Sequence, residues 1–208
     1  MKKYLFALIS LLGLWSYGGD LKAQTYAVRS DIISNLSGNF NLEVSSSISS
    51  HLSVHLPLFV RPVNLGLPYS IGLYNLRNNY GYRSREIPLF ESIATDQAIG
   101  IQPGVRYWTL LANNYGLFMG AFGIGELFKH GGFEDYPYYI QGYSVGAGAS
   151  IGYAKVVTPN WNFELELGLG VVGRFYDRRD VRTDRILNHN RDLTWALARF
   201  GVNLVYLL

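Results

Sequence analysis

The chain has 208 residues, of which 49% are hydrophobic and 15% aromatic, and its formal net charge is +3. This length allows one domain that buries a substantial surface. The chain has no cysteine, which excludes disulfides, a thiol nucleophile and a lipid-bearing cysteine.

The N-terminus has the pattern of a cleaved export signal. A basic head precedes an uncharged, mostly apolar run over residues 4–19, and the small residue Ala23 follows. The run is shorter than the ~20 residues of a membrane-spanning helix. We therefore predict a signal peptide over residues 1–23 and a mature domain over residues 24–208. Removing the signal lowers the net charge from +3 to about +1, so the composition does not favour a nucleic-acid partner.

The mature region alternates apolar and polar residues with a period of two, which is typical of β-strands. Val, Leu, Tyr and Phe occupy one parity, and Gly, Ser, Asn or charged residues occupy the other. Helical periodicity is not sustained. We predict an all-β fold with strands at Tyr26–Ser34, Asn39–Ser46, Leu52–Val60, Ile99–Thr109, Tyr115–Gly125, Gly142–Ala154, Asn162–Phe175 and Leu193–Leu207.

The first connection, "NLSG", is short although it lies on the long-loop side, and the later connections alternate between short turns and long loops. The long loops cover about 61–98, 126–141 and 176–192. In an up-and-down sheet the short turns then meet at one end and the long loops at the other. This pattern is typical of a bacterial outer-membrane protein. The sequence therefore predicts an eight-stranded antiparallel transmembrane β-barrel of the outer-membrane type, with its long loops outside.

The polar parity distinguishes this barrel from a soluble one that carries a ligand. A soluble barrel turns its polar parity to water and fills it with Lys and Glu, whereas only two lysines remain in the mature chain. We therefore expect the polar parity to line the lumen, the space inside the barrel. The charges there have mixed signs and can pair. The expected lumen network comprises Arg29, Asp31, Glu43, Arg106, Glu164, Glu166 and Arg199.

Aromatic residues gather near the short-turn end of the predicted strands. Such residues form belts at membrane surfaces, although aromatic pairs also occur across strands of soluble sheets. We expect a belt at the inner membrane surface formed by Trp108, Tyr115, Tyr153, Trp161 and Tyr206.

The segment 174–192 is rich in arginine and aspartate. A charge run of this kind is usually a solvated, self-paired loop. The alternative is that Arg178, Arg179, Arg182 and Arg185 bind lipid phosphates or an acidic partner, since guanidinium groups match phosphate bidentately.

Three further patterns indicate other chemistry only weakly. "GLGVVG" at residues 168–173 has dinucleotide-binding spacing, but no helical pattern follows it. His51 and His55 would lie about 13 Å apart on a strand, too far to share one zinc ion. His130 and His189 would lie in outer loops, where a rim-located lipid-modifying hydrolase could use them, but no nucleophile motif accompanies them. We therefore predict no enzymatic activity, no catalytic residue, no metal site and no cofactor.

The closing "RFGVNLVYLL" resembles the C-terminal signal that the outer-membrane barrel assembly machinery reads. Arg199 is its polar residue, followed by Gly201, the apolar Leu204 and the aromatic Tyr206. It departs from that signal by ending in Leu208 rather than in an aromatic residue.

Longer stretches resemble a Bacteroidetes family known as domain of unknown function 3575. These are "IQPGVRYWTL", "GYSVGAGASIGYAKVVTPNWNFELELGLG" and "VNLVYLL", and the similarity is strongest over residues 99–172. The resemblance implies a small outer-membrane barrel, with some members encoded near fimbrial genes, and it implies no known activity.

We therefore expect a structural or surface-interaction role in the outer membrane, such as envelope integrity, adhesion or association with fimbriae. The expected partners are outer-membrane lipid and lipopolysaccharide, the assembly machinery, and fimbrial or envelope proteins. A narrow pore for small solutes is the alternative.

Overall fold

The computed structural model describes residues 26–36, 38–62, 97–109, 113–131 and 138–208. The predicted signal peptide and most of the predicted loop 61–98 lie outside the described residues. The described elements, in chain order, are β1 (Tyr26–Asp31), α2 (Ile32–Leu36), β2 (Phe40–Ser47), β3 (Leu52–Arg61), β4 (Gln97–Ile101), β5 (Gly104–Trp108), β6 (Gly116–Gly131), β7 (Tyr138–Thr158), β8 (Trp161–Asp180) and β9 (Ile186–Leu207).

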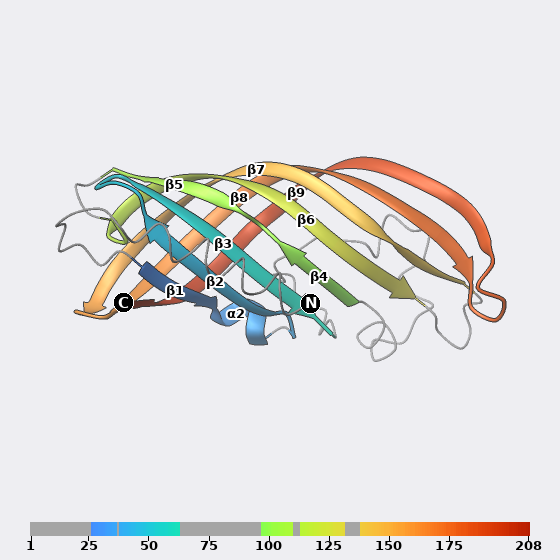
Figure 1. The fold of residues 1–208 in the computed structure, drawn as a ribbon, viewed down its shortest axis with the longest axis horizontal. Coiled ribbons are helices and arrows are strands. Elements are labelled where there is room, and N and C mark those ends of the chain that lie inside the picture. Colours follow the sequence, from blue (N-terminus) through green and yellow to red (C-terminus); the bar gives the residue numbers. More distant parts are fainter. Residues whose placement is uncertain (1–25, 37, 63–96, 110–112, 132–137) are drawn as a thin grey trace, which may run out of the picture.

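The strands form one antiparallel sheet that closes on itself into a ring of eight positions (Figure 1). Except for β4 and β5, each strand pairs with the next along the chain, and the last strand, β9, pairs with the first, β1. The two short strands β4 and β5 together occupy one position, between β3 and β6. Closure leaves the paired part of the sheet without a free edge, and a free edge is otherwise prone to pairing with other chains.

The strands wind around the ring with a large stagger. Following the paired residues strand by strand from Ala27 of β1, through β2, β3, β5, β6, β7 and β8, leads to Ala196 of β9. Where β9 closes directly on β1, however, Ala27 pairs with Leu207. The stagger is therefore about eleven positions (207 − 196), or ~36 Å, against a circumference of ~38 Å for eight strands. These lengths correspond to a strand tilt of roughly 40°, which is usual for closed sheets.

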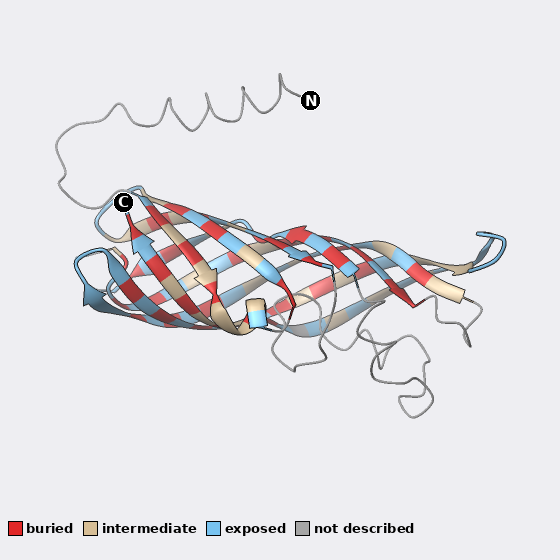
Figure 2. Ribbon diagram, turned by 90° about the horizontal axis from the view of Figure 1, so that it is seen from below, coloured by how far each residue is buried: buried red, intermediate tan, exposed pale blue. Residues whose placement is uncertain are grey.

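The ring is apolar outside and polar inside. Along β8, residues from Trp161 to Gly170 alternate between exposed and buried, and the exposed ones include Phe163, Leu165, Leu167 and Leu169. Figure 2 shows the same alternation along the neighbouring strands. Because side chains of a strand point to opposite faces in turn, the buried residues share the interior of the ring.

Two predicted strands differ from the observed elements. The first was expected to run to Ser34, but β1 ends at Asp31, whose carboxylate accepts a hydrogen bond from the backbone of Ile33 at the start of α2. The fourth is interrupted at Gln102 and Pro103, where the proline lacks the N–H that a continuous strand would need.

Two predicted loops are mostly strand. Within 126–141, β6 continues to Gly131 and β7 begins at Tyr138; within 176–192, β8 continues to Asp180 and β9 begins at Ile186. Their polar composition suggested loops, but the strands continue in register as a twisted extension beyond the ring, at the right of Figure 1. Among the described residues, no helix is long and apolar enough to cross a membrane.

Candidate functional site: a charged cluster inside the ring

All seven residues of the predicted lumen network are buried on the inner face of the ring. They come from five strands that span the chain from its first strand to its last: β1, β2, β5, β8 and β9. Closure of the sheet therefore brings them together. The residues are Arg29, Asp31, Glu43, Arg106, Glu164, Glu166 and Arg199.

Arg106 lies at the centre of this network. Its Nη1 is 2.8 Å from Glu43 Oε1, and its Nη2 is 2.5 Å from Glu166 Oε2 and 3.2 Å from Glu164 Oε1. Its guanidinium group also lies 4.8 Å from the centre of the Phe118 ring. One arginine thus joins three carboxylates from two sides of the ring.

Arg29 and Arg199 lie on either side of this centre. Arg29 Nε is 3.2 Å from Glu164 Oε2, and Arg29 Nη1 is 3.3 Å from Glu43 Oε1. Arg199 Nη1 is 3.0 Å from Glu166 Oε1. We call these three arginines and three glutamates the ion cluster. Its formal charges cancel, and each member has at least one partner of opposite sign, as burial of charge requires.

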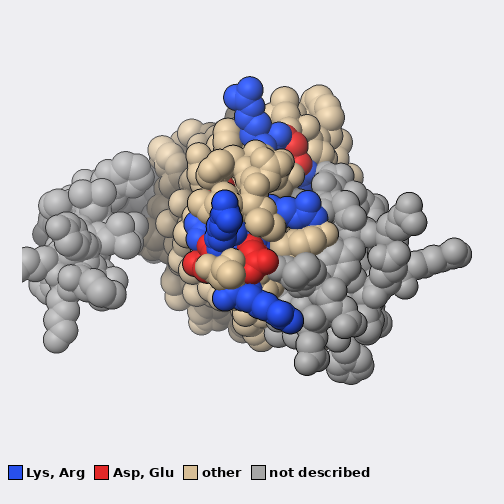
Figure 3. Space-filling model, turned by 90° about the vertical axis from the view of Figure 1, so that its right-hand side faces the viewer, with Lys and Arg blue, Asp and Glu red and all other residues tan. Residues whose placement is uncertain are grey.

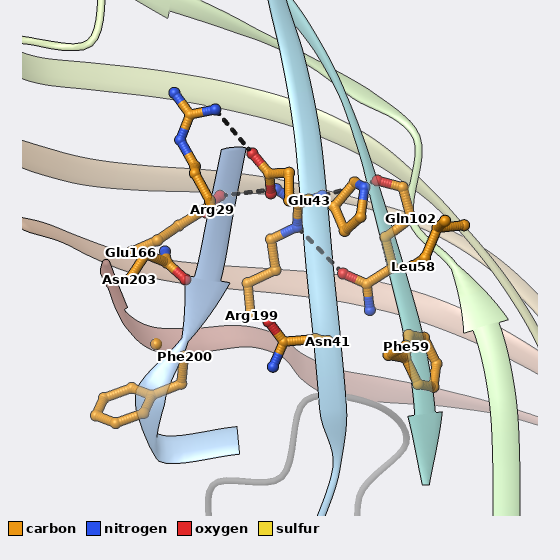
Figure 4. A pocket seen from close by; sticks show the side chains of 12 residues that line it. Arg29, Asn41, Glu43, Leu58, Phe59, Gln102, Glu166, Arg199, Phe200 and Asn203 are labelled. Carbon is orange, nitrogen blue, oxygen red and sulfur yellow. Dashed lines mark hydrogen bonds and ion pairs between the residues drawn. The ribbon is translucent and has the colours of Figure 1, made fainter. Parts of the chain in front are cut away.

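Neutral groups complete the hydrogen bonding of the ion cluster. Arg199 donates through Nε to Gln102 Oε1 at 3.2 Å and through Nη2 to the Gln102 carbonyl at 2.8 Å (Figure 4). Arg29 donates to the side chains of Ser45 and Asn114. Asn203 Nδ2 donates to Glu164 Oε1 at 3.3 Å.

His55 also lies in the interior, beside the ion cluster. Its Nδ1 lies 3.7 Å from Glu43 Oε1 and 3.5 Å from Arg199 Nη1. His51 lies at the turn before β3, where its ring is 5.8 Å from that of Tyr107. Within the described residues, no group of three or more His, Cys, Asp or Glu could hold a metal ion.

Asp31 is buried near the ion cluster, but its carboxylate hydrogen-bonds to backbone N–H groups rather than to the cluster. Its Oδ1 accepts hydrogen bonds from the N–H groups of Ile33 at 3.0 Å and Val202 at 3.2 Å. It therefore fixes the start of α2 against β9. A Cβ at Gly201 would lie 2.8 Å from this carboxylate, which explains a glycine there.

Little open space remains around the ion cluster. A cavity of about 30 Å³ lies beside Arg29, Glu43, Gln102 and Arg199, enough for about one water molecule. Toward the short-turn end, Trp108 and Phe118 fill the interior, with ring centres 4.8 Å apart. The described interior is therefore packed.

A second set of ion pairs, one buried and one half-buried, lies nearer the long-loop end. Arg61 Nη2 is 3.4 Å from Glu126 Oε1, and Arg174 forms two hydrogen bonds of 2.7 and 2.8 Å to the carboxylate of Asp192. None of these four residues belongs to the predicted lumen network. Arg61, Glu126 and Asp192 were assigned to loops, although all four lie on the polar parity of extended strands.

Four of the five residues predicted to form an aromatic belt are exposed, and one is buried. Tyr115, Tyr153, Trp161 and Tyr206 are exposed on the outer face, and the rings of Trp161 and Tyr206 lie 4.9 Å apart. Trp108 is 0% exposed and donates from Nε1 to Ser53 Oγ at 3.0 Å. Its assignment to an outward belt is wrong because it shares the inward parity of Arg106, and Tyr107 is the exposed aromatic residue of β5.

The four predicted phosphate-binding arginines differ in their surroundings. The Arg178 guanidinium lies 3.6 Å from the ring centre of Tyr138, and Arg179 pairs with Asp177 at 3.6 Å and Asp184 at 3.4 Å. Arg182 and Arg185 are exposed, and no side-chain ion pair is formed by either one within the described part of the chain. Figure 3 shows blue and red side chains grouped at this end of the molecule.

Two aspartates stabilise the turn between β8 and β9 by accepting hydrogen bonds. Asp180 Oδ1 accepts hydrogen bonds from the backbone N–H groups of Thr183 and Arg182, both at 2.9 Å, and these bonds lower the pKa of Asp180. The hydroxyl of Tyr139 donates to Asp184 and lowers the pKa of that carboxyl.

The two histidines considered for hydrolysis lie apart. His130 is buried on β6. His189 is exposed on β9, with Nδ1 2.6 Å from Asp177 Oδ1. The hollow beside His189 is lined by no serine or threonine among the described residues.

Fold and site together define an all-β protein in which a closed ring of antiparallel strands surrounds a buried, neutral cluster of arginines and glutamates. The chain belongs to the family described as protein of unknown function (DUF3575), whose profile matches residues 6–208. Searches of curated proteins and of solved structures gave no match to the chain.

Proposed function

We propose that this protein is an exported β-barrel of the bacterial outer membrane with a non-enzymatic role in envelope structure or surface interaction. The observation that carries the proposal is the inverted polarity of the ring. Leu, Ile, Val, Tyr and Phe side chains cover the outside, and three arginines and three glutamates are buried inside. A soluble protein has no reason to expose this surface, whereas lipid solvates it.

The height of the apolar surface supports this proposal. On β7 the exposed Tyr143 and Tyr153 lie ten positions apart, or ~33 Å along the strand. With a tilt of roughly 40°, the two residues are ~25 Å apart along the axis of the ring, which is the height of the apolar band in outer-membrane barrels. Tyr143 stacks on Phe175 at 5.1 Å and would lie at the outer surface.

A structural role is favoured over a pore by the packed interior. Conduction needs a continuous wet path, and the described interior holds an ion cluster and aromatic rings with a cavity of about 30 Å³. A hydrolase is disfavoured because the Asp177–His189 pair has no described serine or threonine in the adjoining hollow.

A surface-interaction role is supported by the extension of β6 to β9 beyond Tyr143 and Phe175. It carries exposed charges, among them Arg182 and Arg185, that could bind lipopolysaccharide or an acidic envelope or fimbrial protein. The C-terminal residues Gly201, Leu204 and Tyr206 on β9 support delivery by the barrel assembly machinery.

Two matched substitutions test the proposed membrane location. Leu169 lies midway between Tyr143 and Tyr153 in height, and Leu187 lies on the extension; both are exposed. In lipid, Leu169→Arg should cost about 2–4 kcal/mol, while Leu187→Arg should be tolerated. Folding into lipid vesicles, read from heat-modifiable mobility on a gel, measures both. Equal tolerance of the two changes would refute the membrane location.

A further inference from the structure

The outer face of β7, β8 and β9 carries two hollows that follow one another along the strands. The hollow nearer the extension, of about 430 Å³, has polar residues on its wall, including Gln141, His189 and Arg191. The second, of about 480 Å³, is walled mainly by apolar residues, among them Ala149, Leu169 and Trp195. We call them the upper and lower hollows. Tyr143 and Phe175 belong to the upper one.

The lower hollow is bounded by the most exposed apolar side chain of the described chain. Trp195 is 81% exposed, and Leu193, two positions before it, is 76% exposed. Trp195 pairs across β8 with Val171 and then Ala147, so its large ring stands beside much smaller side chains. Because the Trp195 ring extends farther from the sheet than the side chains of Val171 and Ala147, the space beside it can hold a chain of methylene groups.

Arg191 supplies a charge at the polar end of this surface. Its side chain points outward from β9 and forms no ion pair with the described residues. The other nearby cations are engaged: Lys129 lies 4.5 Å from the Tyr139 ring, and Arg179 pairs with Asp177 and Asp184.

The stagger of the ring sets the height of Arg191. The stagger of about eleven positions over eight strands corresponds to ~1.4 positions per strand. Tyr143 of β7 is aligned through Phe175 of β8 with Arg191 of β9, two strands away. The point of β9 that lies at the same height as Tyr143 is therefore about three positions after Arg191. That point falls between Leu193 and Trp195. Trp195 therefore lies just within the apolar band, and Arg191 lies ~7 Å above its edge, at headgroup depth. Arg182 and Arg185 lie farther from the band, beyond the end of β8.

We propose that the two hollows bind one anionic membrane lipid, with its phosphate on Arg191 and an acyl chain beside Trp195 in the lower hollow. This inference rests on the proposed membrane location. A cation above an aromatic girdle, with an apolar hollow below, matches the polarity of a lipid and its direction in the bilayer. The site also differs from the arginine-rich segment 174–192, for which the sequence offered phosphate binding as the alternative to a solvated, self-paired loop.

Trp195 allows the site to be probed directly. Its fluorescence in vesicles that contain brominated phosphatidylglycerol or brominated phosphatidylcholine reports which lipid lies beside it, and subtracting the spectrum of Trp195→Phe removes the signal of other tryptophans. We expect quenching by phosphatidylglycerol at a several-fold lower mole fraction than by phosphatidylcholine.

Arg191→Gln should reduce this preference about five-fold, as expected for one arginine at a membrane surface. Lys155→Gln, which removes an exposed cation at the opposite end of β7, should leave it unchanged. Added inorganic phosphate should not compete, because the acyl chain contributes to binding. Equal quenching by both lipids, equal effects of the two substitutions, or competition by free phosphate would overturn the lipid site.

The same experiment separates the two proposals. Absence of quenching by either lipid at both Trp195 and Trp161 would contradict the membrane location itself. Quenching at Trp161 alone, together with a dimer in analytical ultracentrifugation, would show a second copy of the chain over the hollows and would also overturn the lipid site.

Discussion

At the scale of single residues, the interior depends on charges that neutralise one another. Arg106 contacts Glu43, Glu164 and Glu166, and no other residue of the ion cluster touches three carboxylates. Removing one partner from a buried ion pair costs more than the pair contributes, because the remaining charge is left without compensation. Arg106 is therefore the residue whose loss should be felt most.

Arg106→Gln should lower the free energy of unfolding by about 3–5 kcal/mol, since it leaves three glutamates with two arginines. Unfolding by urea in lipid vesicles measures the change, with the exposed Arg182→Gln as control. Adding Glu164→Gln to Arg106→Gln should restore part of the loss, because Arg29 can still pair with Glu43 and Arg199 with Glu166. A double variant less stable than Arg106→Gln would contradict this account.

At the scale of elements, glycines let aromatic rings fill the interior. A Cβ at Gly152 of β7 would lie 2.2 Å from Phe118 Cζ and 2.5 Å from the Leu165 carbonyl oxygen. A Cβ at Gly123 of β6, in contrast, would approach no atom closer than 3.8 Å. The two glycines therefore differ in what a methyl group would displace.

Gly152→Ala should destabilise the protein by about 1–3 kcal/mol through overpacking, and Gly123→Ala should change stability by less than ~0.5 kcal/mol. Both substitutions add the same atoms to a strand, so a difference in urea midpoint reports the crowding of the new methyl group against Phe118 and the Leu165 carbonyl. Similar midpoints would mean that Phe118 and the Leu165 backbone move aside without cost.

The β8–β9 turn should respond to acid. The pKa of Asp180 is lowered by its hydrogen bonds to Thr183 and Arg182. The turn is therefore stabilised at pH values above the ordinary 3.8 of this carboxyl, and the stabilisation is lost as the pH falls through the lowered pKa. Amide hydrogen exchange at Thr183 should accelerate in that range beyond its intrinsic pH dependence. Asp180→Asn should remove this effect, and an unchanged profile in that variant would exclude Asp180 as its source.

At the scale of the whole molecule, closure of the sheet turns the ordinary arrangement of a protein inside out. The polar core is stable because every charge of the ion cluster has a partner. The apolar exterior is stable in lipid, which is the environment we propose. The strands β6 to β9 rise beyond the band and present charged groups above it.

Reconstituted protein should show no steady conductance in a planar bilayer, because the described interior is filled. Channel-like current that persists after purification, with unitary steps, would indicate a wet path and favour the pore. A reconstituted barrel with known conductance serves as the positive control for insertion.

The sequence by itself determined the strand content and the two faces of each strand. Period-two alternation placed Arg29, Arg106 and Glu164 on one parity, because successive side chains of a strand point to opposite faces. The same alternation placed Trp108 on the parity of Arg106, which points inward. The pattern itself therefore predicted a buried Trp108, and its assignment to the belt went against that pattern. The Asp31 end of β1 was missed because a carboxylate cap on a five-residue helix has no periodic signal.

Only the tertiary structure decided which charges meet. Arg29 and Glu164 lie 135 positions apart in the chain, and their contact follows from the stagger at which β9 closes on β1. Asn114 enters the cluster from a turn, where alternation says nothing about direction. Alternation is a local property of the backbone, whereas closure and stagger depend on how all the strands pair, and these decide the partners inside the ring and the height of each residue along its axis.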